Sequence, residues 1–367
     1  LLITSLSSEL GAADVAAALG VPSEAAHALV DRARATGLIE PSHPPRFLRQ
    51  VHRAVAQIVG TARHHDLEAA LLRTQVEMST LSPELALRLA EHGVRDPRLA
   101  DILRRQAGSA RSDPAVAARL YRAAVDAGAT ELRAMLADAL GASGDCSAAA
   151  ALADELLGSD DATERAVAVR VAAGVAAHDG NLAQAAELFT WLGPNPDATV
   201  SAAAAVVLTG TGDAVAARAA LSAANGGPPT AAARAARSLA DGLLLTVEAP
   251  YPGAATKLGQ AIAVDYPAGQ VLPDSAPALI TLVALHGGDP VRARSVIGRA
   301  VRTGGDALFD QRHRLLLAWV KMQDGHLSAA AADVAALDRL HRRDALWAAA
   351  LRTAIARRGG DPGAAQK

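Results

Sequence analysis

Aromatic residues are scarce in this chain of 367 residues: they make up 2% of it, although hydrophobic residues make up 51%. The apolar residues are therefore mostly alanine, leucine and valine, and alanine and leucine are strong helix formers. Because β-branched and aromatic strand formers are sparse, the composition predicts helix almost throughout the chain.

Cysteine is represented by Cys146 alone, which excludes a disulfide within the chain and favours a reducing compartment. No apolar run is long enough to span a bilayer, and no signal-peptide pattern opens the sequence. We therefore expect a cytoplasmic protein without a membrane partner. The formal charge of −2 gives no global electrostatic reason to expect nucleic acid.

The most frequent feature is a repeated segment in which glycine usually precedes an acidic or polar residue, here called the marker. Markers lie at positions 113, 145, 181, 213, 289, 326 and 361, with a degenerate copy at 251. The resulting spacing of 32 to 38 residues is typical of arrays of helical hairpins. We expect the glycine to end one helix in a left-handed conformation, and the marker to cap the next helix.

Alanine follows each marker by four residues, and a second apolar residue usually follows by eight. The alanines are Ala117, Ala149, Ala185, Ala217, Ala255, Ala293, Ala330 and Ala365. A small side chain lets antiparallel helices approach closely, and the apolar residue one turn later fills the seam. The first helices of the hairpins are expected at 162–178, 197–209, 229–247, 275–287, 306–323 and 341–357.

Residues 1–60 follow a different pattern, the outline of a winged helix. Two helices are expected on either side of Gly20, with Ser23 as the cap of the second. The remaining elements are two short strands at 38–40 and 46–49, a proline-rich tip between them at 41–45, and a further helix at 52–59. Five arginines and five acidic residues cancel in this segment, which favours a structural module over DNA binding.

A winged helix followed by divergent tetratricopeptide-like repeats resembles the MalT-like regulators, which are signal-transducing ATPases with a LuxR-type DNA-binding end. The stretches that carry the resemblance are AAALGVP (16–22), GLIE (37–40), RFLRQVHRAV (46–55), PELALRLAEH (83–92) and DPAVAARLY (113–121). The resemblance implies an all-α fold in three parts. These are a winged-helix arm, connecting helices, and a sensor formed by a tetratricopeptide-like right-handed superhelix: residues 1–60, 61–110 and 111–367.

The chain departs from that family in two respects: it has no G-x-x-x-x-G-K-[ST] phosphate loop and no second basic helix-turn-helix after residue 340. It also begins at Leu1, without Met and inside an expected helix, so we expect a piece of a longer protein. The resemblance then implies that ATP and DNA bind to modules outside this chain, which itself needs no cofactor. It further implies a small inducer in the superhelix, with a carbohydrate such as a maltodextrin or trehalose as the best candidate.

No catalytic motif stands out, and we expect no enzyme activity in this chain. The nearest group of metal-ligating residues is His52 with His64, His65 and Asp66. Adjacent histidines on a helix point about 100° apart, so His64 and His65 cannot chelate as an i, i+4 pair would. We therefore expect a solvated face and no metal site. Cys146, with no histidine nearby in the sequence, is expected to be an unreactive thiol.

The first helices of such hairpins tend to line the concave face of a superhelix, where a ligand would bind. Charged residues at helical spacing and aromatic residues near irregular segments are the candidates, because sugars need both. The predicted ligand-binding residues are Trp191, Arg237, Asp241, Tyr266, Asp310, His313 and Arg314. Asp310, His313 and Arg314 are expected to share one helix face. Four other aromatics are expected in the core: Tyr121, Phe189, Trp319 and Trp347.

Two other hypotheses remain open. A protein–protein scaffold would carry a long open groove with an apolar or single-sign stripe. A DNA-binding winged helix would bind duplex through residues 1–60 in a salt-dependent manner.

Overall fold

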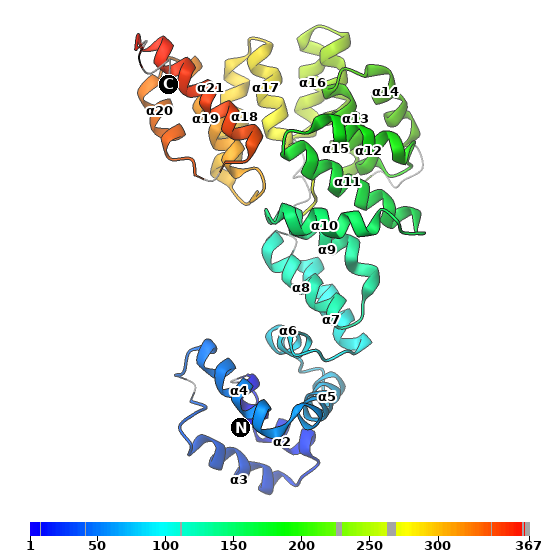
Figure 1. The fold of residues 1–367 in the computed structure, drawn as a ribbon, viewed down its shortest axis with the longest axis vertical. Helices are drawn as coiled ribbons and strands as arrows, with labels where there is room; N and C mark the ends of the chain where they lie inside the picture. The colour runs from blue at the N-terminus through cyan, green and yellow to red at the C-terminus, as the bar shows by residue number, and fades with distance from the viewer. Residues whose placement is uncertain are drawn as a thin grey trace. The chain divides into compact units, whose positions relative to one another are not determined.

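The computed structural model describes residues 1–7, 9–40, 42–110, 112–224, 230–262, 269–338, 340–361 and 363. Every regular element among these residues is a helix, so the expected all-α fold is confirmed (Figure 1). The chain divides into two compact units: unit 1 comprises residues 1–110 with 119–133, and unit 2 comprises 111–118 with 134–367. No described helix combines the length and the apolar character needed to cross a bilayer.

Unit 1 is an assembly of short helices in which α2 packs against α3 and α5, and α1 packs against α4. The helices are α1 (Leu2–Leu6), α2 (Ala12–Leu19), α3 (Ser23–Arg34), α4 (Pro45–Val59), α5 (Thr61–Glu77), α6 (Pro83–Glu91) and α7 (Pro97–Ser109). α8 (Pro114–Asp126) crosses the division between the units. Five fully buried leucines lie on α5, α6 and α7: Leu71, Leu85, Leu89, Leu99 and Leu103.

The two strands expected in unit 1 are not there. Residues 46–49 belong to α4, and residues 38–40 have no strand pairing. Pro45 suits the first turn of a helix, where its missing N–H has no partner to lose. Leu48, Val51 and His52 are buried at helical spacing, so burial of one helix face prevails over the strand interpretation. Of the expected tip between the strands, Pro41 lies outside the described residues.

The predicted caps in this region have mixed outcomes. Gly20 ends α2 with a φ of 64°, in the left-handed conformation that glycine adopts at no steric cost. Ser23 is the first residue of α3 and makes no capping hydrogen bond, so its predicted role as the cap is wrong. Pro22 occupies the N-cap position instead.

A polar cluster lies inside unit 1, where a solvated face was expected. His52 of α4 and Glu68 of α5 are 4% and 1% exposed, and they meet His64 of α5 and His92, which follows α6. The prediction is therefore wrong for His52 and His64, and only His65 of the two adjacent histidines is exposed. The sequence argument considered neighbours along one helix. Packing of α4, α5 and α6 brings the other partners together.

Unit 2 continues as a succession of helices in hairpins, joined by short turns. They are α9 (Arg133–Ala142), preceded by the 3₁₀ turn η1 (Thr130–Leu132), α10 (Cys146–Leu156), α11 (Ala162–His178), α12 (Leu182–Leu192), α13 (Ala198–Gly210), α14 (Ala214–Ala223), α15 (Ala231–Glu248), α16 (Tyr251–Ala261), α17 (Ala276–His286), α18 (Pro290–Thr303), α19 (Asp310–Gln323), α20 (Leu327–Ala335) and α21 (Arg342–Arg358). The predicted first helices correspond to α11, α13, α15, α17, α19 and α21.

The glycine conformation predicted for the repeated turns is confirmed in the described residues, and the capping role is confirmed at five markers but not at His326 or Tyr251, which make no capping hydrogen bond. The glycines before six markers have φ between 73° and 91°: Gly144, Gly180, Gly212, Gly288, Gly325 and Gly360. Five marker side chains accept the backbone N–H three residues later: Asp113, Asp145, Asn181, Asp213 and Asp289. Seven of the eight alanines after the markers are at most 6% exposed, while Ala365 lies outside the described residues. The four aromatics assigned to the core are buried or pack against it.

One irregular segment, residues 269–275 between α16 and α17, enters the interior of unit 2; we call it the strap. Its Val271 is fully buried against Gly141 of α9 and Gly174 of α11. A Cβ atom built on these glycines would lie 2.3 and 2.6 Å, respectively, from the Val271 side chain. The strap can pack this closely only because both helices carry glycine at the contact.

Replacing Gly174 by alanine is expected to destabilise unit 2. Alanine in a helix gains about 1 kcal/mol over glycine. At Gly174, however, the new Cβ would clash with Val271, and such overpacking costs about 1–3 kcal/mol. Gly259→Ala in α16 is the matched control, because its Cβ would meet no atom within 4 Å. Urea unfolding can be followed by tryptophan fluorescence, since Trp191, Trp319 and Trp347 all lie in unit 2. Equal stabilisation by both substitutions would contradict the strap packing.

In unit 2, polar contacts join the last helix, α21, to the end of α11. Arg343 Nη1 of α21 donates to the carbonyl oxygen of Ala177 in α11 at 3.1 Å, across 166 residues of sequence. His341 Nδ1 lies 2.7 Å from a carboxylate oxygen of Asp179, directly after α11. The N-terminal end of α21 is therefore held against the C-terminal end of α11.

Candidate functional site

The strap is anchored at one end by a buried ion pair between α9 and α11. Arg170 is 3% exposed, and its Nη1 and Nη2 donate to the two carboxylate oxygens of Asp138 at 3.0 and 2.5 Å. The same Nη1 donates to the Val271 carbonyl at 2.7 Å, and the Val271 N–H donates to Asp138 Oδ1 at 2.7 Å. Both backbone polar groups of Val271 thus find partners inside unit 2.

A second buried ionic group anchors the other end of the strap. Arg312 of α19 donates through Nε and Nη2 to the two oxygens of Asp274, at 2.8 and 2.7 Å. Its Nη1 donates to Asp344 of α21 at 2.8 Å, and its guanidinium lies 5.0 Å from the ring centre of Trp347. Burial alone would lower the pKa of Arg312, but the two carboxylates raise it above its ordinary value. Arg312 therefore stays charged, with a carboxylate on either side.

Of the three residues expected to share a face of α19, only His313 reaches this interior. It is 4% exposed, and its Nε2 lies 2.6 Å from Ser275 Oγ of the strap. Arg314 and Asp310 form a pair at 2.9 Å on the surface, with side chains 56% and 33% exposed. The shared-face prediction is confirmed for Asp310 and Arg314 and wrong for His313. Successive residues of a helix are 100° apart, so the boundary of the buried face runs between His313 and Arg314.

The other predicted ligand residues lie elsewhere. Arg237 is exposed and Asp241 is half-buried on α15, and among the described residues no ion pair joins them. Tyr266 lies outside the described residues. Trp191 is 60% exposed at the end of α12, so it is a surface side chain of unit 2.

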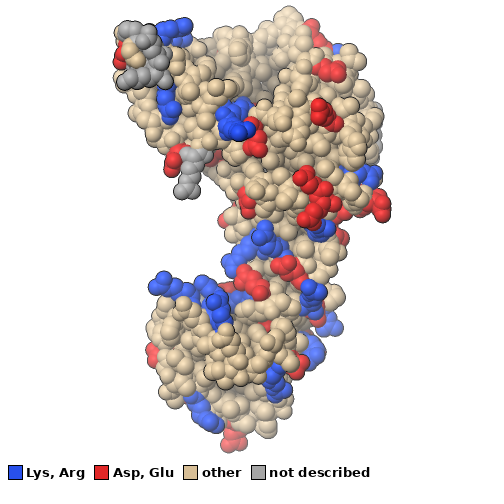
Figure 2. Space-filling view, in the orientation of Figure 1, with Lys and Arg blue, Asp and Glu red and all other residues tan. Residues whose placement is uncertain are grey.

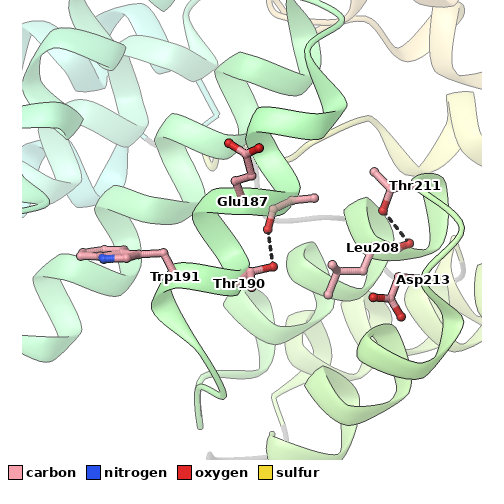
Figure 3. A pocket seen from close by; sticks show the side chains of 7 residues that line it. Glu187, Thr190, Trp191, Leu208, Thr211 and Asp213 are labelled. Atoms are coloured by element: carbon pink, nitrogen blue, oxygen red, sulfur yellow. Dashed lines mark hydrogen bonds between the residues drawn. The ribbon is translucent and has the colours of Figure 1, made fainter.

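Trp191 borders a shallow hollow of about 440 Å³ between α12, α13 and α14. Three of its four polar side chains are already engaged: Thr190 and Thr211 donate to carbonyls of their own helices, and Asp213 caps α14, which leaves the exposed carboxylate of Glu187. Figure 3 shows the Trp191 ring extending away from Thr211 and Asp213. The hollow therefore offers a ligand one exposed ring and few free hydrogen-bonding groups.

The interior around the strap is different, because it holds buried polar atoms without hydrogen-bond partners among the described residues. These atoms are His178 Nδ1 and Arg343 Nε and Nη2. Arg343 also lies in ion-pair range of two carboxylates: its Nη1 is 3.4 Å from Asp274 and its Nε is 3.7 Å from Asp344. The His178 ring lies 4.1 Å from that of His341 and 5.6 Å from that of Phe309. Each unpaired buried group costs about 1–3 kcal/mol, so acceptor atoms of a ligand would be favoured here. We call His178, His313, Arg312, Arg343 and Asp274 the interior site.

Burial is the main cause of the pKa shifts of His178, His313 and Asp306 in and beside the interior site. Burial is the largest cause that lowers the pKa of His178 to about 4; the charges of His341 and Arg343 add to it, and nearby carboxylates oppose it. Burial likewise lowers the pKa of His313 and raises that of Asp306 beside it. The interior site thus presents neutral imidazoles together with charged arginines at neutral pH.

Cys146 lies closer to histidine than its sequence neighbours indicate. Its thiol and ring nitrogens of His178 and His341 lie within 4.8 Å of one another. Burial first, and then the charges of two nearby aspartates, raise the pKa of the thiol to about 11. Cys146 is therefore protonated at neutral pH, which agrees with the expected low reactivity.

The sequence argument missed the charged residues that hold the strap. One signal was available: Arg170 stands alone in the apolar helical run AVAVRVAAGV. Arginine is almost never fully buried unless it is paired, so a lone charge in a buried helix indicates a partner elsewhere in the fold. Nothing in the local sequence identifies that partner as Asp138.

Comparison of the chain with protein-family models, with curated proteins and with solved structures finds no match.

Proposed function

We propose that this chain is the ligand-sensing part of a MalT-like transcriptional regulator, with an all-helical arm in unit 1 and a tetratricopeptide-like superhelix in unit 2. It would bind a small polar inducer, a carbohydrate such as a maltodextrin or trehalose being the first class to test. ATP and DNA would bind to other modules of the same regulator. The observation that carries the proposal is the interior site, where buried donors of Arg343 lack hydrogen-bond partners among the described residues and lie beside the buried ionic groups.

The strap suggests how binding would be sensed. Arg170 and Arg312 now donate to acceptors of the strap and to carboxylates of neighbouring helices. A hydroxyl-rich ligand could replace the strap's acceptors and also accept from Arg343. Its binding would then release residues 269–275 from the interior and change how α11, α19 and α21 are joined. A ligand shifts such an equilibrium only by its differential affinity for the two states.

A thermal-shift screen tests this proposal. A ligand at 100 times its Kd should add about 2.7 kcal/mol to the free energy of unfolding, a clear rise in Tm. Maltotriose, trehalose, nucleotides and peptides would be screened against the whole chain. We expect a dose-dependent shift with one sugar.

Two variants locate the binding site. Arg343→Met should abolish the shift, because it removes the donors of the interior site that have no hydrogen-bond partner among the described residues. Trp191→Ala should leave it unchanged, because that ring lies in the outer hollow. Loss of the shift in Trp191→Ala alone would place the ligand in the hollow and contradict the role given to the interior site.

The same screen also tests the alternative hypothesis, a protein–protein scaffold. It calls for a groove with an apolar or single-sign stripe, whereas Figure 2 shows acidic and basic side chains scattered over the visible face of unit 2. A shift with peptides and none with small molecules would nevertheless favour the scaffold. No shift with any compound would contradict the sensor proposal.

A further inference from the structure

The polar cluster of unit 1 brings four donor atoms together from three parts of the chain. His64 Nε2 and His92 Nδ1 lie 3.0 and 2.6 Å from Glu68 Oε1. His52 Nε2 lies 3.1 Å from His64 Nε2 and 3.6 Å from Glu68 Oε1. All four atoms lie within 4.8 Å of one another. Four ligands around a tetrahedral zinc ion, with bonds of about 2.0–2.1 Å, lie about 3.3 Å apart, which is close to this arrangement.

The surroundings of His52 direct its Nε2 lone pair into the cluster. Its Nδ1 lies 3.1 Å from the carbonyl oxygen of Leu2 and 3.0 Å from Ser5 Oγ, both in α1. A carbonyl oxygen can only accept, so the Nδ1 carries the hydrogen and Nε2 is left unprotonated in the neutral ring. A histidine that binds a metal is commonly oriented in this way, through its second nitrogen and a backbone carbonyl.

Glu68 has more ligand capacity than its protein neighbours use. Its side chain is 1% exposed, Oε1 is shared by three imidazoles, and Oε2 is buried with no hydrogen-bond partner among the described residues. An unpaired carboxylate oxygen in a buried site is costly. A cation bound among the four donors would compensate the negative charge of this carboxylate, whose Oε2 has no hydrogen-bond partner among the described residues.

We propose that His52, His64, His92 and Glu68 form a binding site for one Zn²⁺ ion in unit 1. Imidazole nitrogens suit zinc, and four protein ligands leave no open position, as in structural zinc sites. The ion would join α4, α5 and the end of α6. The His92 side chain is 27% exposed, so the ion could enter from solvent on that side.

Metal titration of the whole chain tests this site. The chain would be stripped with a chelator and studied in a Cys146→Ser background, which removes the thiol of the other donor cluster. Co²⁺ is the spectroscopic probe, because tetrahedral Co²⁺ absorbs visible light far more strongly than the octahedral aqua ion. We expect this absorption to saturate at one equivalent and Zn²⁺ to displace it. Absence of both signals from the folded chain would overturn the proposal.

Adjacent histidines supply a matched pair of variants. His64→Gln removes a ligand and should weaken Zn²⁺ binding about 100-fold or more, since even loss of a supporting residue costs 10–100-fold. His65→Gln changes the exposed neighbour and should leave affinity and stoichiometry unchanged. Glu68→Gln, which keeps the shape of the side chain, is the second test if His64→Gln fails to fold. Equal Zn²⁺ affinity in folded ligand variants and in His65→Gln would show that these side chains form only a hydrogen-bonded core.

Discussion

Arg312→Met is expected to lower the free energy of unfolding of unit 2 by about 3–5 kcal/mol, the usual effect of removing one partner from a buried ionic group. Arg312 is 3% exposed and is hydrogen-bonded to both Asp274 and Asp344. Methionine keeps most of the side-chain volume, so the loss would come from two carboxylates left buried with fewer partners. Part of the loss would come from the contact with Trp347.

The neighbouring residue provides the control for this prediction. Arg314→Met makes the same substitution on the same helix, but Arg314 forms its pair with Asp310 on the surface. Exposed pairs of this kind contribute about 0.3–0.5 kcal/mol. Urea unfolding monitored by tryptophan fluorescence would measure both variants. If the two variants lost similar stability, Arg312 would not hold the strap and α21 together as the contacts indicate.

The helical hairpins of unit 2 could be predicted because their chemistry is local. A left-handed glycine, a capping side chain and a small residue one turn later lie within six positions, so a single copy can show the whole signal. Gly180, Asn181 and Ala185 illustrate this, and each has the expected conformation or burial. The start of α4 is also local, but the winged-helix outline placed a strand at residues 46–49, where Pro45 and the burial of one helix face favour a helix.

The strap and both polar clusters could not be predicted in this way, because their partners are distant in sequence. Val271 bonds with Arg170 and Asp138 across 101 and 133 residues. His52 and His92 come together only when α4, α5 and α6 pack. For the ligand residues, helical spacing alone did not show which side of α19 would be buried, so His313 was grouped with two surface residues.

Lowering the pH from 7.5 to 4 is expected to destabilise unit 2 in part through His178. The folded protein keeps this imidazole neutral down to a pKa of about 4, mainly through burial, whereas in the unfolded chain it protonates near pH 6.5. Between these values the unfolded chain binds more protons, so acidification favours unfolding. His178 thus contributes stability that is fully present above pH 6.5 and declines toward pH 4. The pKa difference corresponds to at most about 3 kcal/mol.

His178→Gln separates this contribution from those of other groups that titrate in the same range. His313, whose pKa burial also lowers, and the carboxylates facing the site, Asp179 and Asp274, remain in both proteins. Free energies of unfolding at pH 7.5, 6, 5 and 4 would therefore be compared between His178→Gln and the unmodified chain. We expect the variant to lose less stability on acidification, with the two curves separating below pH 6.5. Parallel curves over this range would mean that His178 takes up its proton in the folded protein as readily as in the unfolded chain, and that the interior site is open to water.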